Sequence, residues 1–205
     1  MLRILIEEKN RMVALSKAEK IKRSSIIDMA ITFTAMTRVF EKNSKPEIAK
    51  KLEQVLAKIE SVEIQEDFET LHSDFCVWFV NTIRTAEKNY ENNKVKPSMP
   101  ASYGHAAKVF DIVSKVYVYY SSLPSCTVAS ILIPYLHGAI DTQILTSLKS
   151  KYPNELISAS SIEMIDKVGY EKLQKLIGKH IIDDFDNGIN PVQYDDIQWY
   201  GLNRK

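Results

Sequence analysis

Residues that interrupt helices are scarce in this sequence. Its 205 residues include only 6 glycines and 7 prolines, and apolar residues recur at spacings of three and four almost throughout. This period is typical of amphipathic helices, whereas a half-buried strand alternates with a period of two. We therefore expect an all-α protein, folded as one compact multi-helix globular domain over residues 1–205, with two helical lobes as the alternative.

Other absences restrict the class of protein. The two cysteines, Cys76 and Cys126, have neither the number nor the spacing of a disulfide framework or a zinc site. We therefore expect a cytoplasmic protein without a metal or another cofactor. No apolar run approaches the roughly 20 residues of a membrane span, which predicts a soluble chain with no membrane partner. Acidic residues follow the first few apolar ones, so no signal peptide is expected.

An excess of positive charge is also missing. Lysine and arginine total 27 against 26 aspartates and glutamates, which gives a net charge of +1. The chain is therefore not a strongly basic protein of the kind that coats nucleic acids, and any binding to DNA would need local clustering of positive charge. The basic start of the first long helix, with Lys17, Lys20, Lys22 and Arg23, is one such cluster.

Apolar periodicity and capping residues predict where the helices lie. The expected helices span 16–40, 44–61, 65–88, 102–120, 125–136, 141–151, 170–185 and 194–202, with short elements near 160–167. An extra turn or two before residue 16 is the alternative for the first of them. Ser44, Ser102 and Asp141 are expected to be N-caps, and Ser125 to start a helix. Residues 89–101 are polar and contain two prolines. They are expected to link an N-terminal helical part, 1–88, to a C-terminal part, 102–205, that carries the candidate site.

Two lysines interrupt the otherwise apolar helix expected after Ser102. Lys108 and Lys115 are seven residues apart and so share one helix face, with His105 beside them. This face is either the solvent-exposed edge or the wall of a cleft. In a cleft, desolvation and a neighbouring cation would lower the pKa of a lysine and supply the neutral amine that attacks an electrophilic carbon.

The segment His137-Gly-Ala-Ile-Asp141 holds a second set of candidate residues. Asp141 precedes an amphipathic run, as an N-cap does. A carboxylate held by backbone amides is also well placed to stabilise positive charge that develops on a sugar ring. His137 is interpreted either as a substrate-binding residue or as a partly buried histidine without a metal-binding role.

Three segments together resemble a known family. They are Lys108–Tyr119 with its two lysines and aromatic residues, His137–Ile144 with Asp141 opening a helix, and Pro191–Trp199 with its Pro-Val-x-x-Asp-x-x-x-Trp pattern. Their order and approximate spacing are similar to those of the archaeal 8-oxoguanine DNA glycosylases of the helix-hairpin-helix superfamily, over residues 103–199. A helical family without an assigned activity that shares these segments is the alternative.

The resemblance implies a DNA-repair glycosylase and lyase that acts on double-stranded DNA. It implies that Lys108 attacks the sugar and that Asp141 supports cleavage of the glycosidic bond, while His105, Lys115, His137 and Trp199 bind the substrate. This sequence departs from the family in two places. Its turns at 100–104 and 123–126 contain at most one glycine, and His137-Gly-Ala replaces the proline that usually precedes Ile-Asp.

Two readings without catalysis stay open. In the first, the lysines contact phosphates and the chain is a helical nucleic-acid-binding module. In the second, exposed aromatic residues such as Trp199 and Tyr200 form a protein-interaction surface, and the partner is another protein or a second copy of the chain, as in a homo-oligomer.

Overall fold

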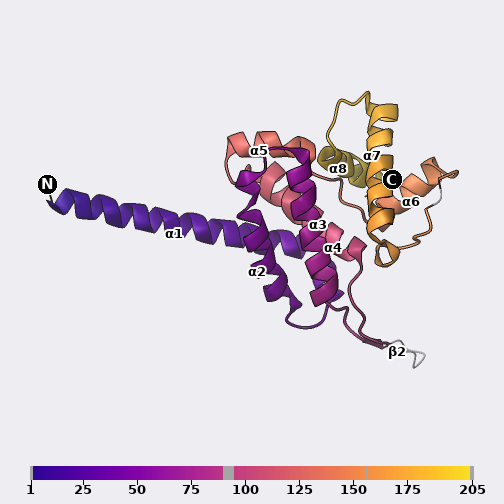
Figure 1. Ribbon diagram of the computed structural model, residues 1–205, viewed down its shortest axis with the longest axis horizontal. Coiled ribbons are helices and arrows are strands. Elements are labelled where there is room, and N and C mark those ends of the chain that lie inside the picture. The colour runs from indigo at the N-terminus through magenta and orange to yellow at the C-terminus, as the bar shows by residue number, and fades with distance from the viewer. Residues whose placement is uncertain (1, 90–94, 156, 204–205) are drawn as a thin grey trace.

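The computed structural model describes residues 2–89, 95–155 and 157–203, and these residues are mostly helical (Figure 1). The expected all-α class is confirmed. Along the described residues run α1 (Leu2–Phe33), α2 (Ser44–Leu56), α3 (Gln65–Thr82), α4 (Tyr103–Ser114), α5 (Cys126–Leu132), α6 (Thr142–Lys151), α7 (Lys167–Phe185) and α8 (Pro191–Asn203). None of these helices is both long enough and apolar enough to cross a lipid bilayer.

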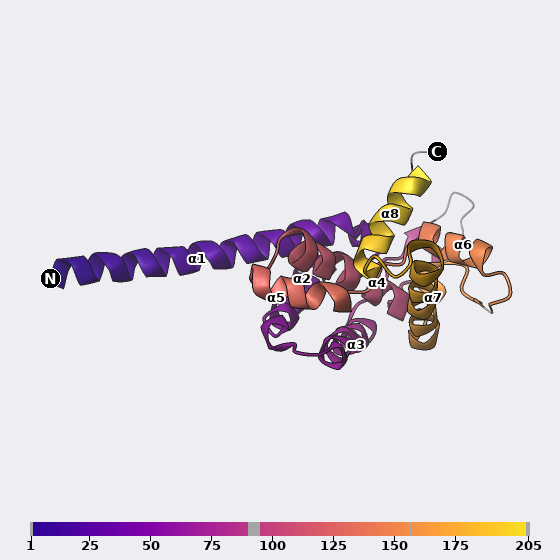
Figure 2. The same ribbon diagram turned by 90° about the horizontal axis from the view of Figure 1, so that it is seen from above.

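Helix α1 differs most from its expected limits. It begins at Leu2 rather than near Ser16, because residues 2–15 contain neither glycine nor proline and are rich in strong helix formers. Its N-terminal half projects from the rest of the molecule (Figures 1 and 2). Only its C-terminal part is buried in the core, through Ile27, Ala30 and Ile31.

The end of α1 is set by a local turn that the periodicity did not reveal. The helix stops at Phe33 instead of Phe40, and Ala35 takes a left-handed conformation with φ of 54°. The Thr34 hydroxyl donates to the Ile31 carbonyl oxygen and accepts from the Met36 amide. This turn therefore satisfies polar groups that the helix end leaves unpaired.

Several helix starts lie where the capping residues predicted. The side chains of Ser102, Ser125 and Asp141 each accept hydrogen bonds from backbone amides in the first turn of α4, α5 and α6. Ser44 is an exception, because it is the first residue of α2 and Asn43 occupies the cap. Asp166 likewise starts α7 a little before the expected Tyr170.

The segment after α3 is not the simple linker that was expected. Helix α3 stops at Thr82 rather than Lys88, since the buried Ile83 is extended and its carbonyl oxygen accepts from the Ala101 amide. Strands β1 (Lys88–Asn89) and β2 (Val95–Lys96) then pair in antiparallel fashion. Residues 90–94 of the expected linker lie outside the described residues.

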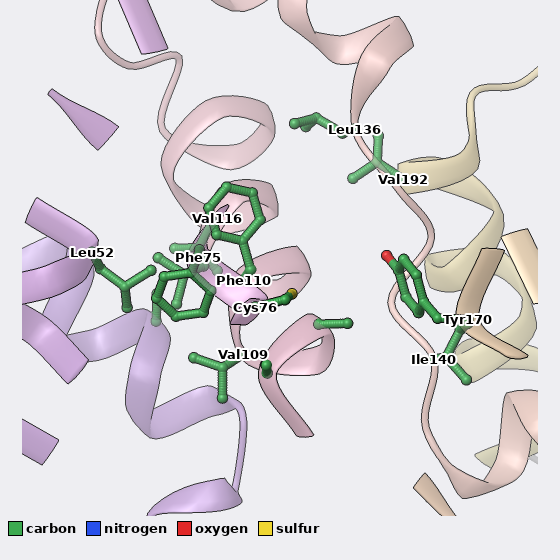
Figure 3. Packing of buried hydrophobic residues seen from close by; sticks show 14 of the residues in the cluster. Leu52, Phe75, Cys76, Val109, Phe110, Val116, Leu136, Ile140, Tyr170 and Val192 are labelled. Carbon is green, nitrogen blue, oxygen red and sulfur yellow. The ribbon is translucent and has the colours of Figure 1, made fainter. Parts of the chain in front are cut away.

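One hydrophobic cluster extends from Ile27 to Tyr194 and draws on all the larger helices. Helices α3 and α4 pack against each other at its centre, and α1 and α2 cover them from one side. Phe75 of α3 and Phe110 of α4 lie in contact there, with ring centroids 5.2 Å apart (Figure 3). Helices α6, α7 and α8 pack together on the other side (Figure 1).

Alanine substitutions at two glycines test this packing, because they should change the stability in opposite directions. A Cβ at Gly104 would lie 2.3 Å from the Ile162 carbonyl oxygen and 2.8 Å from the Ile165 Cβ, whereas a Cβ at Gly178 of α7 would meet no atom within 4 Å. We expect Gly104→Ala to lower the free energy of unfolding by about 1–3 kcal/mol, because backbone has to move. Gly178→Ala should raise it by about 0.5–1 kcal/mol. Urea unfolding of both variants measures the difference, and an unchanged Gly104→Ala protein would contradict this packing.

Candidate functional site

A cleft is lined by residues from the end of α1, the middle of α4 and the middle of α8. Its volume is about 430 Å³, which is within the range of small-molecule sites. Residues 33–35 form one wall, and Ala139, Asp141 and Ile144 form another. Lys108, Lys115 and Trp199 also line it. Residues from four distant parts of the sequence therefore share one concave surface.

Lys108 lies in the second turn of α4, whose register is set by the Ser102 cap. Its side chain is partly buried in the cleft. Burial lowers the pKa of Lys108 from its usual value, while the negative charge of Asp141 acts in the opposite direction. A lowered pKa increases the fraction of neutral amine at a given pH, and the neutral amine is the nucleophilic form.

Asp141 lines the same cleft and is held rigidly. Its Oδ1 accepts hydrogen bonds from the Gln143 amide at 2.8 Å and from the Ile144 amide at 2.9 Å. These two hydrogen bonds therefore fix the orientation of the carboxylate at the N-terminus of α6. Lys108 and Asp141, the two residues expected to carry out catalysis, thus face one cavity.

Lys115 is the second lysine of the cleft, and its charge is neutralised. It lies at the start of a π-helical turn, Lys115–Tyr120, that continues α4, a type of turn that is frequent at functional sites. Its amino group pairs with the carboxylates of Asp195 and Asp196. Burial acts to lower the pKa of Lys115, but Asp195 and Asp196 raise it above its usual value. Lys115 is therefore charged at neutral pH.

Asp195 connects this ion pair to the backbone of the cleft wall. Its other oxygen, Oδ2, accepts from the Ala139 amide at 3.0 Å. Burial raises the pKa of Asp195 to about 6, although Lys115 opposes the rise. The lysines and carboxylates that line the cleft include two cations and three anions. Among the described residues that line it, the cleft therefore has no excess of positive charge that would attract a phosphate.

Aromatic rings border the open side. Trp199 of α8 is 57% exposed and Tyr120 of the π-helical turn is 57% exposed. The Tyr120 hydroxyl donates to Asp196 at 2.6 Å, and the amino group of Lys115 lies 5.5 Å from its ring centroid. Flat exposed rings at a cleft mouth are suited to stacking on a planar ligand such as a nucleobase.

The two histidines expected to bind substrate lie elsewhere. His105 is 3% exposed, and its Nδ1 accepts from the Ser102 amide at 3.2 Å as part of a capping box. His137 belongs to a separate polar cluster with Asp111 and Tyr170. Neither is among the described residues that line the cleft.

Sequence reasoning missed several residues that the fold brings into these sites. Asp195 and Asp196 belong to the Pro191–Trp199 segment, but no local pattern indicated that they reach Lys115. Asp111 offered a usable signal, because a carboxylate between Phe110 and Ile112 interrupts an apolar helix as plainly as the lysines do. No known family model matches this chain, and no curated protein or solved structure is significantly similar to it.

Proposed function

We propose that this chain is a DNA glycosylase with lyase activity that removes an oxidised purine through a Schiff base on Lys108. The observation that carries the proposal is the cleft shared by Lys108 and Asp141, in which burial lowers the pKa of the lysine. The order of the three sequence segments supports the same assignment, because two of them supply Lys108 and Asp141 and the third supplies Trp199.

The reaction begins with the neutral Lys108 amine. Its nitrogen forms a bond to C1′ of the deoxyribose while the bond from C1′ to the base breaks, and the base leaves with the electron pair and takes up a proton. The new ammonium group loses a proton, the sugar ring opens as its oxygen is protonated, and an imine remains between Lys108 and C1′. Loss of a proton from C2′ then expels the 3′ phosphate, and water hydrolyses the imine.

Asp141 has a defined part in this scheme. The sugar carries positive charge as the bond to the base breaks, and a fixed carboxylate stabilises that charge without having to reorient. Asp141 also accepts the proton that the attacking amine releases. The base itself would leave the duplex stack, enter the cleft and stack on Trp199.

Contacts to the DNA backbone would come from outside the cleft. Lys17, Lys20 and Lys22 are exposed on α1, the helix whose end forms one cleft wall. Phosphate contacts of this kind position a duplex without reading its sequence.

Borohydride trapping tests the proposal. A duplex with a single 8-oxoguanine is incubated with the wild-type chain, Lys108→Gln or the matched control Lys175→Gln, which changes an exposed lysine of α7. We expect a covalent adduct with the wild type and the control and none with Lys108→Gln. Asp141→Asn, which keeps a capping oxygen, should slow adduct formation by about 100-fold or more.

Two outcomes of the same assay would contradict the proposal. A wild-type chain that forms no adduct with either the 8-oxoguanine duplex or an abasic duplex is not a lysine-dependent glycosylase or lyase. An adduct that persists in Lys108→Gln would assign the chemistry to another amine.

A nucleic-acid-binding module without chemistry is the second candidate. The ion pairs of Lys115 with Asp195 and Asp196 favour it, because they leave the cleft without surplus positive charge while exposed lysines lie on α1. Duplex binding that weakens steeply with salt, without release of a base, would support this candidate.

A further inference from the structure

A compact group of polar side chains lies inside the molecule, apart from the cleft. His72 of α3 and Asp111 of α4 are 1% and 3% exposed. The side chain of His137, which precedes α6, is 10% exposed. Tyr170 of α7 is also buried, and its hydroxyl donates to Asp111. Four separate elements therefore place imidazole, carboxylate and phenol groups together.

The distances within this group suit a metal ion. His72 Nε2 lies 3.2 Å from Asp111 Oδ1, and His137 Nδ1 lies 3.9 Å from the same oxygen. One donor atom from each of the three residues lies within 4.8 Å of the others. Bonds of 2.0–2.1 Å around a tetrahedral zinc ion put neighbouring donors about 3.3 Å apart. The distance from His72 to Asp111 already agrees. His137 has to move closer: its separation from Asp111 Oδ1 must shorten by roughly 0.6 Å, and a separation of 4.8 Å would have to shorten by about 1.5 Å.

Asp111 supplies a second and independent observation. Its Oδ2 accepts a hydrogen bond from the Tyr170 hydroxyl at 2.9 Å. Its Oδ1 is fully buried and has no hydrogen-bond partner among the described residues, even though His72 is near. A buried carboxylate oxygen without a partner is costly. A cation between the two imidazoles would satisfy it.

The surrounding groups hold the imidazoles as metal ligands require. His137 Nε2 lies 2.9 Å from Glu69 Oε1, which favours a proton on that nitrogen, while Nδ1 lies 2.8 Å from the Tyr170 oxygen and 3.9 Å from Asp111 Oδ1. The His72 ring stacks on the Tyr170 ring with 5.0 Å between centroids and 14° between planes. A histidine that binds a metal usually donates its other ring N–H to a carboxylate outside the ligand set, and Glu69 is such a carboxylate for His137.

The charges also balance. Two neutral imidazoles, the Asp111 carboxylate and a divalent ion sum to a single positive charge, and Glu69 at the rim compensates it. Nitrogen and carboxylate donors in this proportion suit zinc and neighbouring transition metals rather than calcium or magnesium. The Glu69 side chain is 46% exposed, so the group borders solvent on that side.

We propose that His72, Asp111 and His137 bind one divalent transition-metal ion of the zinc type, which joins α3 and α4 to the segment before α6. The Tyr170 hydroxyl borders this group, because its oxygen lies 2.8 Å from His137 Nδ1 and it donates to Asp111 Oδ2. The site is structural, since it joins separate elements of the core and none of its three residues lines the cleft. The sequence contains no short metal-binding motif of cysteines or histidines for this site, because its ligands are spread over residues 72–137.

Co²⁺ is a suitable probe, because its visible absorption reports coordination by nitrogen and oxygen in a tetrahedral field. The full chain, without a histidine tag, is dialysed against a chelator and titrated with Co²⁺ and then with Zn²⁺. We expect one Co²⁺ per chain, displaced by Zn²⁺. Free Zn²⁺ at one hundred times its Kd should raise the Tm by roughly 5–10 °C.

Variants assign the ligands. Asp111→Asn keeps the shape of the side chain and a partner for Tyr170 but lacks the charge, and His137→Gln removes an imidazole close to the surface. Each should weaken Co²⁺ binding by about 100-fold or more. The chain has four histidines, which allows a matched control. His180 is 4% exposed and contacts Tyr194 and Asp184 at 2.8 Å and 2.9 Å, so His180→Gln changes a similar environment outside the group and should leave binding intact.

Two results would overturn the metal site. The first is a wild-type chain that shows no saturable Co²⁺ or Zn²⁺ binding, a result that does not depend on whether any variant folds. The second is binding that Asp111→Asn and His137→Gln both retain at wild-type strength. Borohydride trapping at Lys108 measures a different property from Co²⁺ binding. The failure of the metal site would therefore not contradict the glycosylase proposal, and the reverse also holds.

Discussion

Lys115→Met is expected to lower the free energy of unfolding by about 3–5 kcal/mol at pH 8. Methionine fills similar space, but Asp195, which is 6% exposed, then loses the cation that compensates its buried charge. The Ala139 amide would be the main remaining partner of this carboxylate. Denaturant unfolding of the two proteins at pH 8 measures the difference.

The pH dependence of this loss follows from Asp195. Burial already raises the pKa of Asp195 to about 6 with Lys115 in place, and removal of the lysine raises it further. An acid whose pKa is raised by folding is least costly when protonated, so its contribution to stability falls as the pH rises from about 4 through the folded value. The loss in Lys115→Met should therefore be largest at pH 8 and smaller at pH 5.

A double variant provides the control. Asp195→Asn keeps an acceptor for the Ala139 amide and leaves Lys115 paired with Asp196, so it should cost only about 1.5–3 kcal/mol. Combined with Lys115→Met it should recover a large part of the loss, because no charge remains unpaired at that position. A loss under about 1 kcal/mol in Lys115→Met would show that the pair contributes as little as an exposed salt bridge.

His105→Gln is expected to remove about 2 kcal/mol of the loss of stability between pH 7 and pH 5. Burial lowers the pKa of His105 to about 4, an effect that Glu163 opposes and Lys96 and Lys108 reinforce. A histidine with a lowered folded pKa stabilises the protein fully above the unfolded value near 6.5, and this contribution is lost as the pH falls toward 4. The full effect is about 3 kcal/mol, and about 2 kcal/mol of it falls between pH 7 and pH 5.

Glutamine is the informative replacement at this position. It can accept the Ser102 amide in a capping box as His105 does, but it does not titrate. Denaturant unfolding at a series of pH values should show the wild type losing about 2 kcal/mol more than the variant between pH 7 and pH 5. Parallel pH profiles of the two proteins would mean that His105 is not the group responsible.

The parts of the fold that sequence predicted correctly depend on local chemistry. Ser102, Ser125 and Asp141 each bond amides within three residues, so their capping role is visible in a short window of sequence. The ends of α1 and α3 depend on contacts made elsewhere. Ile83 is extended because its carbonyl oxygen pairs with the amide of Ala101, a partner that no helical period can reveal.

The candidate sites divide in the same way. Lys108, Asp141 and Trp199 were singled out from separate segments, and their common cleft follows from packing between α4, α6 and α8. His72 was hidden because it falls on an apolar face of α3, four residues after Phe68 and four before Cys76. Its partner Asp111 lies on another helix, so only the fold could join them.

The cleft has a consequence for how this protein is made. Its walls include residues 33–35 together with Asp195, Asp196 and Trp199, so it draws on segments that lie far apart in the sequence. During synthesis the N-terminal segments leave the ribosome first. Until α8 emerges, Lys115 has neither Asp195 nor Asp196 beside it, and Lys108 faces an unfinished surface. A nascent chain therefore has no such cleft until translation has passed Trp199.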